Sequence, residues 1–521
     1  MNHQTIIERY LSGRPHEASG RTLIVPTEAR DLADTIRTFA TAGLPLLTVF
    51  ATDDRRAHGT FRIQYVFGVP RESTTIVIRL DLVGAETFPS VAGEFPQFAL
   101  YEREIQSLFG LKPLGHPDPR SFLLHEENWP AGHYPLHKDF AWDTRLSDQH
   151  SGEYRFNRVD GEGVYEIPVG PVHAGIIEPG HFRFSVLGEE IIALEARLGW
   201  VHKGVEKLFE ELSLQKKVAL AERISGDSAF SHSLCFCEAL EMLAGVKAPP
   251  RAAHLRLIFA ELERLTMHIF DIGNIAGNGT GFSFMSSQGF RMVEELRRLS
   301  EKLSDSRFLR GINVPGGISR DLSDGALKDI QEFLKAFRRE FEEVMNVADR
   351  SASLTGRLKE TGVLSLEVAR ELGAVGIAAR SIGISKDVRL DYPYAAYGAV
   401  APKIVLEEAG DVYARFRVRV REVYESIRLI ESAIPMLPQG AVQRDLPPLP
   451  KEGIAISAVE GWRGEIVYAL VAEGGVLSRV KPRDPSFINW QLFAHLISPD
   501  MVPDFPLINK SLNLSYTGND L

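Results

Sequence analysis

Three titratable side chains lie close together in a short segment that is rich in glycine and proline. His173, Glu178 and His181 fall within residues 170–181, whose sequence is GPVHAGIIEPGH. Imidazole and carboxyl groups accept and release protons near neutral pH. The glycines and prolines predict a strand–loop–strand element, and the three titratable groups leave a proton-handling loop as open as the other interpretation. The alternative is a solvated or structural role, which is common for a lone histidine in a loop.

The composition excludes several classes of protein. The net charge of −10 over 521 residues argues against nucleic acid as the main partner and leaves no polybasic membrane patch. No apolar run approaches the roughly 18 residues of a spanning helix, and the N-terminus lacks the apolar core of a signal peptide. Cys235 and Cys237 are too few for an iron–sulfur cluster and too close for an ordinary disulfide. We expect a cytoplasmic chain without a cluster of its own.

The elements that position the loop divide into two predicted domains. The first, residues 1–145, is predicted to be an α+β domain, with a helix over residues 28–42 between strands at 22–26 and 46–50. Two later alternating runs, at 61–67 and 76–82, predict a hairpin around the turn sequence GVPRES. An antiparallel sheet with helical crossovers is expected.

The second domain, residues 167–521, follows a polar linker over residues 146–166 and is predicted to be mainly α-helical with small β elements. Long segments with helical periodicity over residues 187–355 and 405–434 predict a helical bundle. Strand-like runs on both sides of the sequence GWRG predict a second hairpin near the C-terminus.

Linked motifs along the chain carry a resemblance to a known family. Residues 101–110, 115–120 and 136–140 resemble the small peripheral C-type subunit of respiratory complex I. Four further motifs resemble its D-type subunit, which carries the quinone site, and equally the large subunit of formate hydrogenlyase and related membrane-bound hydrogenases: residues 169–173, 310–317, 387–394 and 410–415. The chain is identified as a fused C/D-type member of the nickel–iron hydrogenase large-subunit superfamily.

Residues 223–232 and 511–520 resemble the two metal-binding segments of that superfamily. Each family segment carries a Cys-x-x-Cys pair, and the four thiolates hold nickel and iron. The matching positions here are Ser225, Ser228, Ser515 and Gly518. A serine hydroxyl is a hard, neutral ligand and does not replace a soft thiolate. The resemblance implies an absent nickel–iron centre and an emptied cofactor cavity, shaped by these residues, beside a partner's cluster. Without the resemblance they would be read as helix-start and tail residues.

The resemblance also implies roles for titratable groups. A histidine of the 170–181 loop contacts the quinone in complex I, and a glutamate of this loop is a proposed proton carrier in membrane-bound hydrogenases. We therefore predict that Glu178, His173 and His181 handle protons. Asp227 is predicted to do so too, with a pKa raised by partial burial. Complex I has a quinone-binding tyrosine near this place, whereas residues 223–232 contain none.

Arg389 matches an arginine near the family's metal pocket and is predicted to line the cavity. The alternative is a structural ion pair with Asp387 or Asp391. Glu206 matches a hydrogenase glutamate that helps to bind a structural magnesium, and the alternative is a surface ion pair with a neighbouring lysine, Lys203 or Lys207.

Two further groups have simpler interpretations. Four alternating arginines are predicted to spread around two faces of a helix as a docking or solvated surface: Arg415, Arg417, Arg419 and Arg421. Cys235 and Cys237 are predicted to be small buried residues.

The function that the resemblance implies is an oxidoreductase subunit of the NADH–quinone type, or of a related membrane-bound hydrogenase complex. It would couple electron transfer from a B-type iron–sulfur small subunit to proton or ion movement, with quinone as an acceptor and NAD(H) chemistry in the assembly. Integral membrane partners, H-type and antiporter-like, would hold it on the inner face of the plasma membrane. The alternatives are a non-catalytic scaffold and a nickel–iron hydrogenase with unusual ligands. A chain end at residues 519–521, without the histidine after which hydrogenases are cleaved, is expected if no metal-dependent maturation occurs.

Overall fold

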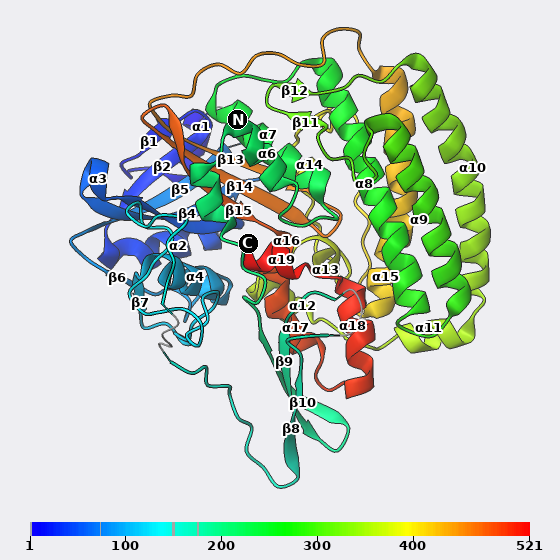
Figure 1. The fold of residues 1–521 in the computed structure, drawn as a ribbon, viewed down its shortest axis with the longest axis horizontal. Helices are drawn as coiled ribbons and strands as arrows, with labels where there is room; N and C mark the ends of the chain where they lie inside the picture. The colour runs from blue at the N-terminus through cyan, green and yellow to red at the C-terminus, as the bar shows by residue number, and fades with distance from the viewer. Residues whose placement is uncertain (1–2, 73, 148–151, 174–176) are drawn as a thin grey trace.

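The computed structural model describes residues 3–72, 74–147, 152–173 and 177–521 of the chain. The N-terminal part contains a five-stranded sheet in the order β1-β2-β5-β4-β3 (Figure 1). Its strands are β1 (Glu17–Ser19), β2 (Thr22–Thr27), β3 (Leu46–Asp54), β4 (Thr60–Val69) and β5 (Thr74–Val83). The predicted hairpin is the antiparallel pair β4–β5. The sheet is mostly antiparallel, as predicted, but β2 pairs with β5 in parallel, which makes it a mixed sheet.

Helices and short strands complete the N-terminal layer. α2 (Leu32–Thr41) buries Leu32, Ile36 and Phe39, as their helical spacing predicts. The other elements of this part are α1 (His3–Tyr10), η1 (Ala29–Asp31), α3 (Arg55–His58), β6 (Thr87–Pro89), η2 (Pro96–Phe98), α4 (Ala99–Phe109) and β7 (Lys112–Leu114).

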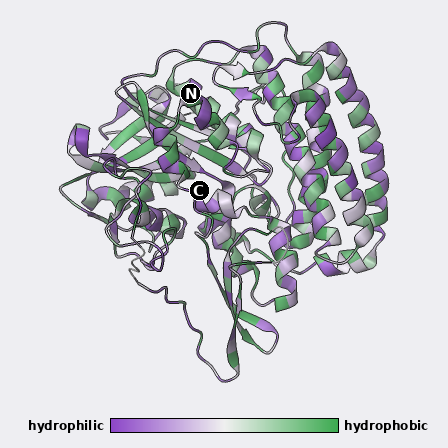
Figure 2. Ribbon diagram, in the orientation of Figure 1, coloured by the Kyte–Doolittle hydropathy of each residue, from purple (hydrophilic) through white to green (hydrophobic). Residues whose placement is uncertain are grey.

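Four long helices lie side by side in the C-terminal part (Figure 1). They are α8 (Pro250–Gly277), α9 (Ser283–Ser304), α10 (Asp324–Asp349) and α15 (Val412–Ala433). α8 is buried along almost its whole length, whereas α10 buries only one apolar stripe and carries hydrophilic residues on its outer side (Figure 2). The predicted bundle is confirmed, and α8 lies between the other long helices and the rest of the chain, where it contacts α7, α9, α15 and α18.

A second antiparallel sheet packs against α7 (Ala229–Leu243) and next to β3. Its strands are β13 (Glu452–Glu460), β14 (Glu465–Glu473) and β15 (Val476–Arg483). The first two form the predicted hairpin. β15 was not predicted, because its buried Arg479, Lys481 and Arg483 hide the apolar alternation that marks a strand.

A narrow three-stranded sheet projects from the body (Figure 1). It consists of β8 (Val164–Val169), β9 (His181–Leu187) and β10 (Glu190–Arg197). β8 and β9 flank the loop of His173 and Glu178, which confirms the strand–loop–strand prediction; residues 174–176 lie outside the described residues. The prediction of helical structure from residue 187 onward is wrong, because β10 pairs with β9 and buries Ile191 and Leu194.

Short elements connect these units. Two helices precede the bundle, α5 (Val205–Glu211) and α6 (Leu214–Ala221). Between its long helices lie β11 (Asn313–Val314), β12 (Gly317–Ile318), α11 (Ala352–Leu358), α12 (Leu366–Glu371), α13 (Gly376–Arg380) and α14 (Val388–Asp391), and η3 (Ile434–Met436) follows α15. After β15 follow α16 (Pro485–Asn489), η4 (Trp490–Leu492), α17 (Phe493–Leu496), η5 (Val502–Asp504), α18 (Phe505–Leu512) and α19 (Tyr516–Asp520). Over the described residues, none of the helices has the length and apolarity needed to cross a bilayer.

Candidate functional site

The two predicted segments meet in the folded chain. The Ser225 Oγ lies 3.0 Å from the Ser515 Oγ, and both side chains are buried. Ser515 is the N-cap of α19 and accepts a hydrogen bond of 2.9 Å from the backbone N–H of Gly518. Ser228 is buried one turn further along the first segment, where its N–H donates to the Ser225 carbonyl at 2.9 Å. The segments therefore come together as the resemblance implies.

Glu263, from α8, fixes the start of α7 and with it the first segment. Its carboxylate accepts the backbone N–H groups of Phe230 at 2.7 Å and Ser231 at 3.1 Å. Ser228 makes no side-chain cap at this helix end, so the carboxylate of a neighbouring helix satisfies the free N–H groups.

A close neighbour restricts position 518 to glycine. A Cβ atom at Gly518 would lie 2.6 Å from the carboxyl carbon of Asp484. Asp484 is itself held by His232, whose Nε2 lies 3.0 Å from its Oδ2, and by the N–H of Ser486 at 2.7 Å. The fourth family cysteine position thus has no room for a side chain.

Arg463 lies in the middle of the site and was not predicted as a site residue. It comes from the β13–β14 turn and donates to both carboxylate oxygens of Asp227, at 2.7 and 2.6 Å. Its Nη1 also lies 3.2 Å from the Ser225 Oγ. The neighbouring Trp462 donates its indole N–H to the Asp227 carbonyl at 3.0 Å. A guanidinium cation therefore contacts the hydroxyl that stands at a thiolate position. The sequence GWRG predicts a turn. The charge of Arg463 within that turn is the one signal that could have marked it as a site residue.

The expected rise in the pKa of Asp227 is wrong. Burial by itself raises the pKa of this carboxyl, but the Arg463 guanidinium and the Ser225 hydroxyl outweigh it and lower the pKa below the ordinary value. The side chain remains 31% exposed. Asp227 is therefore an ionised counter-charge at neutral pH, which is a poor state for a proton carrier.

Glu178 joins the same site from the β8–β9 loop. Its Oε2 accepts the backbone N–H of Thr517 at 3.1 Å. The Thr517 Oγ1 lies 3.3 Å from the Ser515 Oγ, which in turn contacts Ser225. We call this series the hydroxyl chain: Glu178, Thr517, Ser515, Ser225 and Asp227. Asp227 bonds the hydroxyl of Ser225 at one end, whereas Glu178 at the other end contacts the backbone N–H of Thr517 and not its hydroxyl.

The two histidines bond to the backbone of their own loop. The His173 Nε2 lies 2.7 Å from the Gly180 carbonyl, and the His181 Nδ1 lies 3.2 Å from the Gly170 carbonyl. Burial lowers the pKa of His181. These contacts favour the structural alternative, in which the histidines close the loop that carries Glu178, and their proton role stays a prediction.

Arg389 has the predicted alternative partner. Its guanidinium bonds Asp387 at 2.9 and 2.7 Å and Glu261 at 3.0 Å, deep between α14 and α8. These bonds engage Arg389 in a structural ion cluster and favour the structural alternative, and its place in the lining of the emptied cavity stays a prediction.

The contacts of Glu206 match neither the predicted magnesium site nor the alternative, a surface ion pair with Lys203 or Lys207. Its carboxylate faces Arg479 and Lys481, with the Lys481 Nζ 2.9 Å from its Oε1, and not Lys203 or Lys207. Lys481 also contacts Glu104 of the N-terminal part at 2.5 Å. Oxygens that already face two cations do not fit a magnesium ligand set.

The arginines of α15 have two environments. Arg415 and Arg419 are fully buried, and Arg419 pairs with Asp271 at 2.8 Å, so the prediction of a surface role is wrong for them. Arg417 and Arg421 pair with Asp349 and Glu407 and remain partly exposed. Cys235 and Cys237 are buried, as predicted.

The fold and the site together define a hydrogenase-type large chain: an α+β domain joined to a helical domain whose four ligand positions carry no thiolate. A family model of the 30 kDa subunit of respiratory-chain NADH dehydrogenase matches residues 24–145. The model of the 49 kDa subunit matches residues 279–450 and 446–520.

Full-length relatives agree with these matches. Formate hydrogenlyase subunit 5 of Escherichia coli is 32% identical over 91% of this chain and 84% of its own length. The C/D subunit of the NADH-quinone oxidoreductase of Phocaeicola vulgatus is 32% identical over 78% of this chain and 81% of its own. A chain of the archaeal membrane-bound sulfane sulfur reductase, a respiratory membrane complex, superposes with a TM-score of 0.65 at 26% identity, over 69% of this chain and 99% of its own. This chain belongs to the family of fused complex I-type C/D subunits and formate hydrogenlyase-type large subunits.

Proposed function

We propose that this chain is the site-bearing subunit of a membrane-associated, complex I-like oxidoreductase. In this proposal it receives electrons from a partner iron–sulfur subunit and couples their transfer to proton or ion movement in membrane partners. Several relatives support it by their names, which describe NADH-quinone oxidoreductase, formate hydrogenlyase and a respiratory membrane complex. Quinone is the proposed acceptor.

The observation that carries the proposal is the hydroxyl chain. Glu178 at one end is only partly buried, and three hydroxyl groups separate it from the Asp227–Arg463 ion pair at the other. Hydroxyl groups both donate and accept, so the three hydroxyls can pass a proton among themselves. The proposal requires the Glu178 carboxyl, which bonds the Thr517 N–H, to exchange its proton with the hydroxyl of the same residue. Glu178 would exchange protons, and the ion pair would supply a fixed field beside the electron acceptor.

The nickel–iron alternative does not fit these residues. A nickel–iron centre needs four thiolates. Two of the four positions hold buried hydroxyls that contact each other, the third holds another serine, and the fourth holds a glycine packed against Asp484. No step of the proposed mechanism passes through a metal of this chain.

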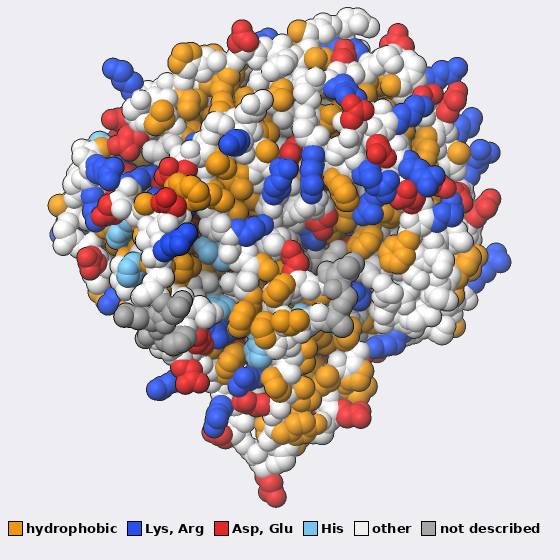
Figure 3. Space-filling model, in the orientation of Figure 1, with side chains coloured by type: hydrophobic (Ala, Val, Ile, Leu, Met, Phe, Trp, Pro, Cys, Tyr) orange, Lys and Arg blue, Asp and Glu red, His pale blue; other side chains and the backbone are white. Residues whose placement is uncertain are grey.

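Partner surfaces are proposed on the projecting sheet and its loop. Tyr165, Leu187 and Ile192 of the sheet are 51%, 50% and 38% exposed, and Val172 of the loop is 84% exposed. Hydrophobic side chains gather on this lower part of the molecule (Figure 3). Exposed apolar patches of this kind mark interaction sites, and the proposed occupants are the iron–sulfur and membrane subunits.

Affinity purification from detergent-solubilised membranes tests the proposal. A tagged chain should bring down an iron–sulfur protein and integral membrane subunits, and vesicles holding the complex should take up or release protons during turnover. Purification of the chain alone from the soluble fraction would contradict it. A complete complex whose turnover is indifferent to Glu178 would favour the scaffold alternative.

A further inference from the structure

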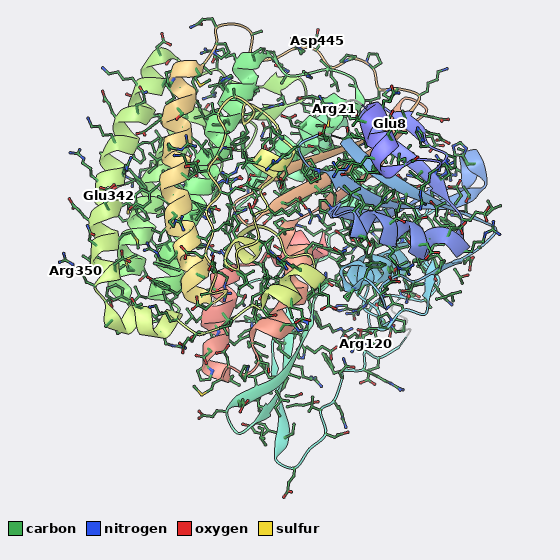
Figure 4. The ribbon with its side chains drawn as sticks, turned by 180° about the vertical axis from the view of Figure 1, so that it is seen from behind. Glu8, Arg21, Arg120, Glu342, Arg350 and Asp445 are labelled. Carbon is green, nitrogen blue, oxygen red and sulfur yellow. The ribbon has the colours of Figure 1, made fainter. Side chains whose placement is uncertain are left out.

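The free edge of strand β13 faces a cavity between the two halves of the chain. β13 is an outer strand of its sheet, whose order is β13-β14-β15. The cavity beside it has a volume of about 470 Å³, and cavities of this size accept ligands. Its lining includes Ile454, Ile456 and Ala458 of β13 and Leu47 of β3. Arg21 of the β1–β2 turn, which is labelled in Figure 4, also lines it.

The register of the β13–β14 hairpin shows which backbone groups of β13 point toward this cavity. Gly461 and Gly464 exchange two backbone hydrogen bonds, at 2.8 and 3.1 Å. Hydrogen-bonded and non-hydrogen-bonded pairs alternate along an antiparallel ladder. Residue 460 pairs with residue 465 next to that bonded pair, so the even-numbered residues 454–460 form the non-hydrogen-bonded pairs. Their N–H and C=O groups therefore point away from β14.

Contacts at both ends of β13 confirm this direction. The Ile454 N–H donates to the Ser19 Oγ at 3.2 Å, and the Glu460 N–H donates to the Tyr394 hydroxyl at 3.2 Å. Neither partner belongs to β14. The outer edge of β13 is thus satisfied at its first and last even-numbered positions.

Two residues between these ends have backbone groups without a protein partner among the described residues. They are Ile456 and Ala458, which line the cavity and are each 8% exposed, so the cavity reaches them. Buried backbone groups are almost always paired. The edge therefore offers two donors and two acceptors at the spacing of a β-strand, which an extended peptide matches by strand addition.

Helix α7 covers one face of this edge. Cys235, Glu238 and Met242 share a face of the helix, because they are spaced by three and four positions. The Cys235 Sγ lies 3.7 Å from the Ser457 Oγ, so the odd-numbered side chains of β13 point toward this face. Glu238 and Met242 also line the cavity. They are therefore within reach of an occupant of the edge.

The α7 wall carries an excess of negative charge. The Arg256 guanidinium bonds Glu241 at 2.9 and 2.6 Å but lies 3.5 Å from the Glu238 carboxylate. One cation thus serves two carboxylates. Burial raises the pKa of Glu238, and Arg256 offsets this only in part. The Glu238 side chain keeps 16% of its surface exposed, so a cationic group of an occupant can balance it.

We propose that the β13 edge binds an extended peptide segment of a partner subunit, with a basic side chain beside Glu238 between two apolar side chains. A residue opposite Ser457 points toward α7, and its neighbours opposite Ile456 and Ala458 point away from α7. Leu47 supplies apolar surface for them. The assignment to a partner subunit rests on the proposed function, whereas the binding of such a peptide does not.

The probe is the capped, fluorophore-labelled peptide Thr-Val-Lys-Val-Thr. Fluorescence anisotropy with the full-length chain, produced without partners, should give a Kd of about 0.1 mM. N-methylation of either valine removes an N–H that bonds β13 and should weaken binding about tenfold. N-methylation of the lysine, whose N–H points away from β13, should change nothing. Methionine in place of lysine should weaken binding about tenfold.

Variants of the chain test the two parts of the site separately. Glu238→Gln should weaken binding of the lysine peptide about tenfold and leave the methionine peptide unchanged. Glu332→Gln, on the exposed side of α10, is the matched control and should change neither. Ala458→Pro removes one cavity-facing N–H and no β13–β14 hydrogen bond. It is the second variant, in case Glu238→Gln fails to fold, and should weaken both peptides about tenfold.

The purified complex tests the identity of the occupant. There the partner's segment should fill the edge and exclude the probe. No binding to the chain alone up to about 2 mM, or equal binding of all the N-methylated peptides, would overturn the peptide site. Binding to the complex as tight as to the chain alone would overturn the assignment to a partner. So would a dimer of the chain that the probe dissociates in sedimentation, because the occupant would then be a second copy.

Discussion

The hydroxyl oxygens of Ser225 and Ser515 lie 3.0 Å apart, although 290 positions separate these residues in the chain. In the hydrogenases whose metal-binding segments these residues resemble, both positions hold metal-binding thiolates. Here the two hydroxyls contact each other, and the Arg463 guanidinium beside them supplies a positive charge. A protein cation and a hydrogen-bonded network therefore join the two segments.

The Asp227–Arg463 pair should be structural. Asp227→Asn removes the negative charge that two Arg463 nitrogens contact and should cost about 1–3 kcal/mol in the free energy of unfolding. The folded pKa of Asp227 lies below its unfolded value, so its stabilisation is present above the unfolded pKa and is lost only as the pH falls through the folded pKa. The shape of the pH–activity profile between pH 5 and 8 should not change. A profile limb that disappears in Asp227→Asn would return this residue to proton transfer.

Restoring the fourth cysteine should damage the fold. Gly518→Cys places a Cβ atom 2.6 Å from the Asp484 carboxyl carbon, which His232 and Ser486 hold in place. We expect a loss of about 1–3 kcal/mol from overpacking, measured by thermal unfolding. The wild-type complex should contain no stoichiometric nickel by elemental analysis. A four-cysteine variant that binds nickel without loss of stability would contradict this account of the site.

Glu263 should make stability depend on pH. Burial, partly offset by its bonds to Ser231 and Phe230, raises the pKa of this carboxyl from 4.5 to about 7. The folded state keeps the proton longer than the unfolded state, so stability should fall by up to about 3 kcal/mol as the pH rises from about 4.5 to 7. Thermal unfolding across pH 5–8 should show a shallower slope for Glu263→Gln. The solvent-exposed Glu332→Gln is the matched control, and an unchanged slope in the Glu263 variant would refute the assignment.

Lys481 should hold the two halves of the chain together. Lys481→Met leaves the buried carboxylates of Glu104 and Glu206 without their shared cation. The expected cost is about 3–5 kcal/mol. Adding Glu104→Gln should recover part of that loss, and the coupling is read from a double-mutant cycle. Additive effects of the two substitutions would show that the contact carries no stability.

The sequence predicts the elements better than the partners of buried charges. α2, the β4–β5 hairpin and the bundle follow from local periodicity, whereas β10 was misread because pairing with β9 overrides its weak pattern. The spacing of the α15 arginines predicts two faces, but only the fold shows that Arg419 meets Asp271 in the core. Arg463 was missed because its partner Asp227 lies 236 positions away. The joining of the two serine segments could be expected from the resemblance alone.

Glu178→Gln tests the central claim, that the hydroxyl chain moves protons without a metal, most directly. The substitution keeps an acceptor for the Thr517 N–H and removes the exchangeable proton. Redox-driven proton movement by vesicles holding the complex should fall by about 10²-fold, the lower end of general acid–base contributions, while the subunit composition stays intact. Glu189→Gln, at the exposed β9–β10 turn, should change nothing. An intact Glu178→Gln complex that moves protons at the wild-type rate would contradict the account.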